Sequence, residues 1–450
     1  MTQQGVRWTA EQVLALAPDD ASRKAGSRLG TAGPWSESGC DGTGAVWGLC
    51  KGSGSRPYQT VLDTSGPAYK CSCPSRKFPC KHAVGLLLLW SGDDRAVPDG
   101  TAPDWAEQWL ASRRGRAEKS ASTSTDVPAA PVDAEAARRR AEKRAERITA
   151  GATELEQRLT DLLRGGLAAA ERPGYGLWEE TAARMVDAQA PGLASRVREL
   201  GAIPGSGPGW PTRLLEECAL LHLLDRAWLG RDALPEQLAA TVRSRVGVAT
   251  PPQGPPIRDR WQVLAQYDTA DAKLTTRRIW LYGRDSGRSA LILDFGAAGR
   301  APALALPVGL TIDADVTPYP GGGQSRAALG ERYGTPTAAE GPPPGGTTTE
   351  AAERYGRALL DDPWIESCAA TVHAAIPIPP KDGDDTWQLA DKEGELALPI
   401  ATNATPRSAL WKLAAVSGGA PVTVFGECGH RGFTPLTVWP AGGREGVGLT

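Results

Sequence analysis

Three cysteines and one histidine within twelve residues constrain the fold of this chain more than any other feature. Cys71, Cys73, Cys80 and His82 form the pattern C-x-C, a short gap, then C-x-H. Three soft thiolates and one imidazole are the ligand set of a closed tetrahedral zinc site. Because four protein ligands leave no position for water or substrate, the pattern predicts one structural zinc ion and no catalytic one.

The spacing also predicts where the ligands lie on local structure. Cys71 and Cys73 are two residues apart, so at the end of a strand both sulfurs can point to one side. On a helix, residues two apart diverge, so Cys80 must precede a helix and His82 must lie in its first turn. The apolar run 83–90 then continues as a helix that covers the inner side of the site.

Two disulfides, or free buried thiols, are the alternative to a metal. The chain opens with no charged stretch followed by an apolar one, as an export signal would have, and no apolar run approaches the roughly 20 residues that span a bilayer. We therefore expect a cytoplasmic protein without membrane segments, and disulfides are rare in that compartment. Cys40 and Cys50 lack the short paired spacing of zinc ligands, so we do not expect them to bind the metal.

The block from Cys73 to His82, together with the upstream stretch 46–54, resembles the SWIM zinc-finger family, and within it the long actinobacterial proteins. The resemblance implies a small ββα finger over about residues 45–90. It also implies that Cys71, Cys73, Cys80 and His82 bind the zinc. SWIM fingers are described as modules for protein and for DNA contacts, and the long members occur beside MoxR-type AAA+ ATPases and von Willebrand A proteins. The resemblance thus names those two classes as expected partners.

Positive charge gathers around the predicted finger. Between residues 51 and 82 a single acid, Asp63, opposes six cations: Lys51, Arg56, Lys70, Arg76, Lys77 and Lys81. With aromatic residues interleaved, such a surface can meet phosphates and stack on bases. The alternative is that these cations only balance the thiolate-rich site and face solvent. The whole chain carries a net charge of −2, so it is not a polycation that coats nucleic acid.

Composition and periodicity predict an α+β protein of several domains. An N-terminal module spans residues 1–110, and a Ser-, Thr-, Ala- and Pro-rich linker at 111–132 is expected to be disordered. Residues 133–250 read as helices with an apolar stripe at alternating steps of four and three, which favours an antiparallel bundle. In residues 257–450 short strands predict a mainly antiparallel sheet or small barrel.

Within this C-terminal region we expect a long Gly- and Pro-rich loop at about 317–350, a helix around 351–375 and a strand at 411–416. The stretch 341–348 has the glycine spacing of a phosphate-binding loop. Thr347 stands where that loop requires lysine, so the sequence predicts no nucleotide site there.

No motif of a known catalytic site appears in the chain, and three of the four histidines lie outside the predicted zinc site. We therefore expect a non-catalytic protein without a small-molecule substrate, whose zinc module and helical and β-rich parts form a scaffold for a partner protein. A nucleic-acid-binding protein that uses the six cations is the alternative. An enzyme with an unrecognised active site is the third hypothesis.

Overall fold

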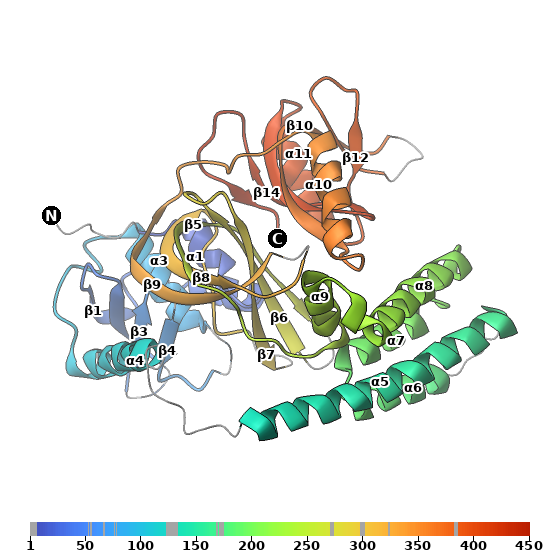
Figure 1. Cartoon of the computed structure of the whole chain (residues 1–450). Coiled ribbons are helices and arrows are strands. Elements are labelled where there is room, and N and C mark those ends of the chain that lie inside the picture. The colour runs from blue at the N-terminus through green and yellow to red at the C-terminus, as the bar shows by residue number, and fades with distance from the viewer. Residues whose placement is uncertain are drawn as a thin grey trace.

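The computed structural model describes residues 7–52, 54, 56–65, 68–75, 77, 79–122, 134–167, 170, 175–270, 274–297, 302–322, 325–381 and 386–450. Within these residues the chain forms an N-terminal module of a sheet flanked by helices, a helical bundle, a closed barrel and a second sheet with two helices (Figure 1). This confirms the predicted α+β class with a central helical bundle and antiparallel strands at the C-terminal end.

The N-terminal module is built on an antiparallel sheet in the order β1-β2-β3-β4, which has helices on both faces. Its elements are α1 (Ala10–Ala15), α2 (Asp20–Ser27), β1 (Trp35–Cys40), β2 (Ala45–Cys50), β3 (Tyr58–Asp63), β4 (Ala68–Cys71), α3 (Lys81–Gly92) and α4 (Asp104–Ser122). Thr9 and Gln12 form a capping box at the start of α1, which satisfies backbone donors there. Apolar side chains of α3 fill one face of the sheet, and Ala106 and Leu110 of α4 cover Trp47 and Val61 on the other.

Helix α4 continues to Ser122, so the predicted disorder of residues 111–132 is wrong for its first half. The segment 111–122 contains many alanines, arginines and other good helix formers, and these extend a helix that already exists. The prediction of disorder rested only on the shortage of apolar residues in this segment. The rest of the predicted linker, residues 123–132, lies outside the described residues.

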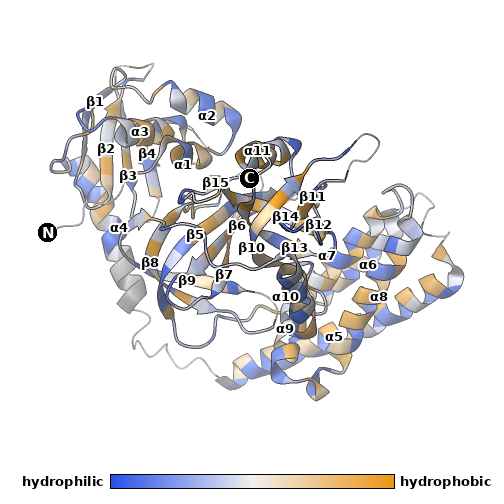
Figure 2. Cartoon of the chain, turned by 90° about the horizontal axis from the view of Figure 1, so that it is seen from above, coloured by the Kyte–Doolittle hydropathy of each residue, from blue (hydrophilic) through white to orange (hydrophobic). Residues whose placement is uncertain are grey.

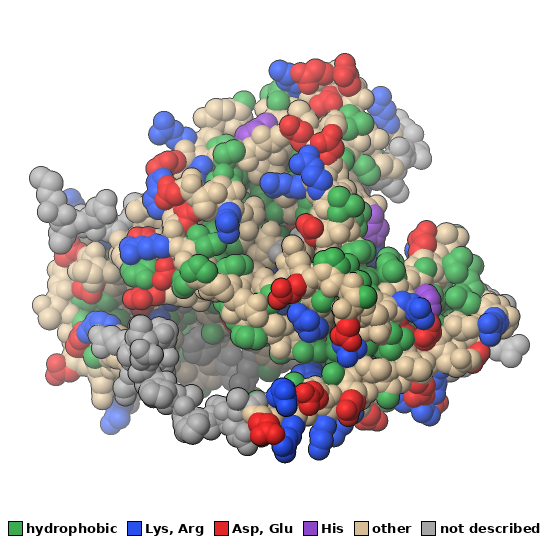
Figure 3. Space-filling view, in the orientation of Figure 1, with side chains coloured by type: hydrophobic (Ala, Val, Ile, Leu, Met, Phe, Trp, Pro, Cys, Tyr) green, Lys and Arg blue, Asp and Glu red, His purple; other side chains and the backbone are tan. Residues whose placement is uncertain are grey.

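The bundle is formed by α5 (Ala134–Gly165), α6 (Tyr175–Asp187), α7 (Pro191–Ala202), α8 (Trp210–Leu229) and α9 (Glu236–Val246). A 3-10 turn at Arg231–Ala233 joins the last two helices. The predicted stripe on α5 is buried in the core, through Ile148, Ala152, Leu155 and Leu159. Acidic and basic side chains lie side by side along the lower edge of Figure 3. On α5, Arg139 pairs with Glu135, and residues 134–147 hold six cations and three acids.

The barrel closes in the order β5-β6-β7-β9-β8. Its strands are β5 (Ile257–Ala270), β6 (Leu274–Gly283), β7 (Ser289–Ala297), β8 (Leu310–Pro318) and β9 (Arg326–Ala338). Strand β9 lies within the long loop predicted at 317–350, so that prediction is wrong there. Most of its side chains are partly or fully exposed, and backbone pairing with β8 carries it. A strand held in this way shows little apolar alternation in the sequence.

The second sheet has the order β12-β11-β10-β13-β14-β15 and carries α10 and α11. Its elements are α10 (Thr348–Asp361), β10 (Ser367–Ile378), β11 (Gln388–Ala390), β12 (Ala397–Pro399), α11 (Arg407–Ser417), β13 (Val422–Gly429), β14 (Gly432–Trp439) and β15 (Val447–Gly448). The helix predicted at 351–375 is thus half helix and half strand. The strand predicted at 411–416 is wrong, because this segment lies in α11.

Apolar interfaces join these parts. The barrel packs against the second sheet through a cluster that includes Trp280 and Phe425. The N-terminal module packs against the barrel, where Val13 and Leu16 share a core with Leu310 and Gln12 Nε2 donates to the carbonyl of Val308 at 2.9 Å. Figure 2 shows α1 beside α11 and β15. None of the described helices combines the length and apolarity that a bilayer crossing requires.

Candidate metal centre and central cleft

The four predicted ligands meet where strand β4 ends and helix α3 begins. Strand β4 ends at Cys71, Cys80 is the N-cap residue of α3 with extended backbone, and His82 lies in the first turn. One ligand atom from each of Cys71, Cys73, Cys80 and His82 lies within 4.8 Å of the others. Within the described ranges, no other group of three or more potential metal ligands meets in this way.

The distances fit a tetrahedral zinc ion. Nδ1 of His82 is 3.7 Å from the sulfur of Cys71 and 4.0 Å from the sulfur of Cys80. Zinc bonds of about 2.3 Å to sulfur and about 2.0 Å to nitrogen place a tetrahedral sulfur and nitrogen roughly 3.5 Å apart, and two sulfurs roughly 3.8 Å apart. The donor set therefore suits one structural zinc, in agreement with the prediction, and Nδ1 is the histidine atom that faces the metal position.

The protonation of the thiols shows why this cluster needs a cation. Hydrogen bonds, chiefly from Cys80 and then from His82 and Thr60, lower the pKa of Cys71 despite its burial. The same contact with Cys71 raises the pKa of Cys80, and burial raises that of Cys73. The cluster alone therefore favours one thiolate. A bound zinc ion would stabilise the thiolate form of all three cysteines, so zinc binding would release protons.

The site is closed on its inner side. His82 is only 5% exposed, and the ring of Tyr58 lies 4.9 Å from its imidazole ring, centroid to centroid. The hydroxyl of Thr60 is 3.3 Å from the sulfur of Cys71 and orients this ligand from behind. Cys50 is fully buried nearby, where burial first, and the neighbouring thiols second, raise its pKa to about 11. It does not belong to the four-ligand cluster.

The six predicted contact cations do not form one free basic face. Those that the structure describes are all exposed: Lys51, Arg56, Lys70, Lys77 and Lys81. Arg76 lies outside the described residues. Lys77 Nζ is 2.6 Å from the carboxylate of Asp19, the N-cap of α2, and this contact is the main cause that lowers the pKa of Asp19 to about 2. Lys77 is therefore engaged within the protein.

Strand register places Lys70 on the opposite face of the sheet from the metal site. Lys70 pairs with Val61, whose side chain packs under α4. Its neighbour Cys71 pairs with Thr60 and points to the other face. The cations that are near each other in the sequence are thus divided between two faces.

The comparisons with known protein families agree with this geometry. Residues 58–90, from the start of β3 to α3, match the family model described as SWIM zinc finger. The chain contains a SWIM zinc finger. Residues 143–246 match the SWIM-associated four-helix bundle domain, which ends here at the last residue of α9. Comparisons with curated proteins and with solved structures gave no match.

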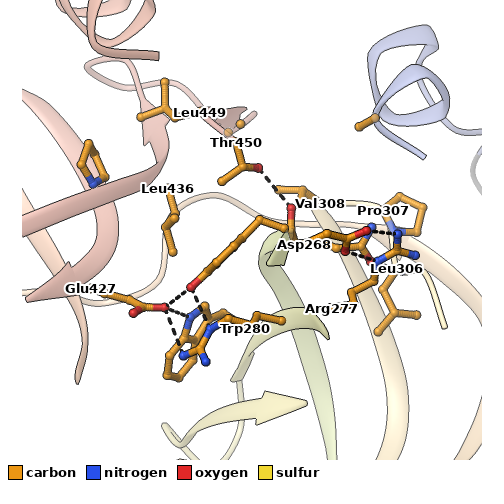
Figure 4. A pocket seen from close by; sticks show the side chains of 18 of the residues that line it. Asp268, Arg277, Trp280, Leu306, Pro307, Val308, Glu427, Leu436, Leu449 and Thr450 are labelled. Atoms are coloured by element: carbon orange, nitrogen blue, oxygen red, sulfur yellow. Dashed lines mark hydrogen bonds and ion pairs between the residues drawn. The ribbon is translucent and has the colours of Figure 1, made fainter. Parts of the chain in front are cut away.

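A cleft that the sequence did not reveal lies between the module with the SWIM finger, the barrel and the second sheet. Its volume is about 1380 Å³. Helix α1 forms one wall, the ends of β5 and β6 form another, and β13, β14 and the segment 444–450 form a third (Figure 4). These segments are distant in the chain, so no local motif could indicate that they meet.

A buried polar network crosses the cleft floor from the barrel to the second sheet. Glu427 is 8% exposed and accepts hydrogen bonds from Tyr267 at 2.6 Å, Ser367 at 2.7 Å and Trp280 at 2.8 Å. Arg278 pairs with it at 3.6 Å. Burial raises the pKa of Glu427, but the charge of Arg278 and these hydrogen bonds outweigh it, and the net pKa is lowered. Glu427 is therefore an ionised cross-link between the barrel and the second sheet.

Proposed function

We propose that this protein is a cytoplasmic, non-catalytic scaffold that binds a partner protein, and that the SWIM finger holds its N-terminal module in shape. One observation carries the proposal: the zinc ligands Cys80 and His82 begin α3, and α3 supports α1, a wall of the central cleft. The zinc site lies outside the cleft lining. Its role is then to position this wall rather than to react with a ligand.

Packing around α3 supports this role for the metal. Ala83, Val84, Leu86 and Leu87 are all fully buried. The end of α2 and the turn after it lie so close to α3 that a Cβ atom added at Gly85 would be 3.2 Å from the carbonyl oxygen of Gly26 and 2.5 Å from the Cβ of Leu29. Such tight packing transmits a shift of α3 to its neighbours, because a close-packed core has no free volume to absorb it. Loss of zinc should therefore displace the α1 wall.

The cleft floor supports a non-catalytic function. Glu427 contacts four partners, and burial raises the pKa of Tyr267, so that Tyr267 stays neutral. Asp268 makes two hydrogen bonds with the guanidinium of Arg277, at 2.7 and 2.8 Å. Both carboxylates are engaged in ion pairs with arginine, which favours a structural role for them.

For the partner, we propose a MoxR-type AAA+ ATPase or a von Willebrand A protein, the classes implied by the family resemblance. Nucleic acid remains the alternative, because Lys51, Arg56 and Lys81 are exposed. This surface carries fewer free cations than the sequence implied, because Lys77 pairs with Asp19 and Lys70 faces the other side of the sheet.

The test compares the two partner classes with the full chain. Complex formation with the ATPase and the von Willebrand A protein of the same host is measured by analytical ultracentrifugation, and binding to a short DNA duplex by a salt titration. We expect a protein complex that survives moderate salt and is unchanged by the double substitution Lys51→Glu with Arg56→Glu. DNA binding that falls steeply with salt, and that this double variant abolishes, would support the nucleic-acid alternative instead. Absence of a complex with either protein would overturn the proposed partners.

A further inference from the structure

Strand β5 has partners on both sides only at Trp261 and Gln262. Strand β8 pairs with residues Ile257–Gln262, and β6 pairs with Trp261–Ala270. From Gln266 to Ala270, β5 therefore has a neighbouring strand on the β6 side only, within the part of the chain that the structure describes. The barrel thus leaves an open strand edge here.

The backbone groups of this edge point into the central cleft. The carbonyl of Gln266 accepts a hydrogen bond from the Thr450 hydroxyl at 3.1 Å, so it faces away from β6. Backbone direction alternates along a strand, so Asp268 and Ala270 present their N–H and C=O groups to the same side. Among the described residues, the backbone N–H and C=O groups of Asp268 and Ala270 have no hydrogen-bond partner. Residues 266–269 line the cleft.

The same cleft already holds a segment in extended conformation. Val447 pairs with Val438 of β14, and the Leu449 N–H donates to the carbonyl of Leu436 at 2.9 Å. The next residue, Thr450, reaches Gln266 on the barrel side (Figure 4). The cleft between the two sheets therefore already accommodates extended backbone beside the edge of β5.

The charges around the edge select the kind of occupant. Asp268 is paired with Arg277, Glu427 with Arg278, and Lys412 with Glu11 at 3.1 Å, so these groups offer a charged ligand no free counter-charge. The edge itself offers backbone groups beside apolar surface of α1 and of the segment 306–308, and Glu366, Arg444 and Glu445 also line the cleft. The cleft volume of about 1380 Å³ also exceeds the roughly 300–1,000 Å³ of small-molecule sites.

We propose that an extended segment of a partner protein adds as a strand to the open edge of β5 at Gln266–Ala270, with apolar side chains at alternate positions. Main-chain hydrogen bonds supply affinity in such strand addition, and alternate side chains supply specificity. The inference rests on the proposed scaffold function and assigns the partner-binding site to the cleft.

The test uses the full chain and a phage-displayed library of random dodecapeptides as the probe. Ala270→Pro removes the outward N–H while leaving the ladder to β6 intact, because proline is tolerated where an edge N–H faces outward. Ala270→Ser is the matched control, since it keeps this donor. We expect enriched peptides with alternating apolar residues, at least tenfold weaker binding to Ala270→Pro, and unchanged binding to Ala270→Ser. Amide hydrogen exchange at Asp268 in the wild-type chain should slow when a peptide binds.

Two results would overturn the proposal. One is a library without any enriched peptide. The other is an enriched peptide that leaves exchange at Asp268 unchanged, and this readout holds even if Ala270→Pro fails to fold. The scaffold function fails separately, through absence of a complex with the proposed partners. A complex that forms while the exchange at Asp268 stays unchanged refutes strand addition alone.

Discussion

A carboxyl group in the core of the helical bundle should make the stability of this protein depend on pH. Asp225 of α8 is fully buried, and neither oxygen of its side chain has a hydrogen-bond partner among the described residues. Burial first, and then the charge of Glu156, raises its pKa from 3.8 to about 8, although Arg226 opposes the shift. We predict that Asp225→Asn, which keeps the shape and removes the charge, abolishes this dependence.

The sign follows from proton binding. Between about pH 4 and pH 8 the unfolded chain has lost the Asp225 proton, whereas the folded chain still holds it. The contribution of the protonated Asp225 to folding stability is therefore fully present below pH 4, and it is lost as the pH rises towards 8. The slope is about 1.4 kcal/mol per pH unit, so from pH 5 to pH 7 the folded state loses on the order of 3 kcal/mol.

The assay is urea unfolding followed by far-ultraviolet circular dichroism, to which the bundle contributes strongly. Other titrating groups cancel in the difference between variant and wild type. We expect Asp225→Asn to gain about 3 kcal/mol relative to wild type between pH 5 and pH 7. Glu216→Gln, on the exposed face of the same helix, is the control and should show no such gain. A difference for Asp225→Asn that stays constant with pH would refute the reasoning.

Three further predictions concern the N-terminal module. Elemental analysis should find one zinc per chain, lost in Cys71→Ser and retained in Cys50→Ser; protein purified under reducing conditions without zinc would contradict the assignment. Asp19→Ala should lower the free energy of chemical unfolding by about 1 kcal/mol, because the N-cap hydrogen bond at the start of α2 is lost. An unchanged unfolding midpoint would argue against that cap. Gly85→Ala should lower the free energy of unfolding by roughly 1–3 kcal/mol through overpacking. Gly92→Ala is the control, because it has open space around it and should be neutral or stabilising. Equal effects of the two substitutions in thermal unfolding would contradict the close approach of α2 and α3.

Features that depend on neighbouring residues were predictable. The capping box of Thr9 with Gln12 and the buried stripe from Ile148 to Leu159 follow from contacts three or four residues apart. Thr347, which excluded a phosphate-binding loop, forms a second capping box with Glu350 at the start of α10. The sequence analysis missed this cap.

Errors arose where a distant contact decides the local structure. The segment 411–416 has the alternation of a strand, but Leu410 and Leu413 are buried one helical turn apart against the second sheet, and Trp411 is 51% exposed. Strand β9 has almost no apolar pattern and exists because β8 offers it a backbone edge. Local preference is weak at both places, so tertiary packing overrides it.

The zinc site is the part of this protein that the sequence determined by itself. All four ligands lie within twelve residues, so strand alternation and one helix start suffice to bring them together. Tertiary structure alone decided what surrounds it: the division of the cations between two sheet faces, the docking of the module on the barrel, and the cleft with the open edge of β5. These features depend on register and on contacts between segments far apart in the chain, and local spacing carries no record of either.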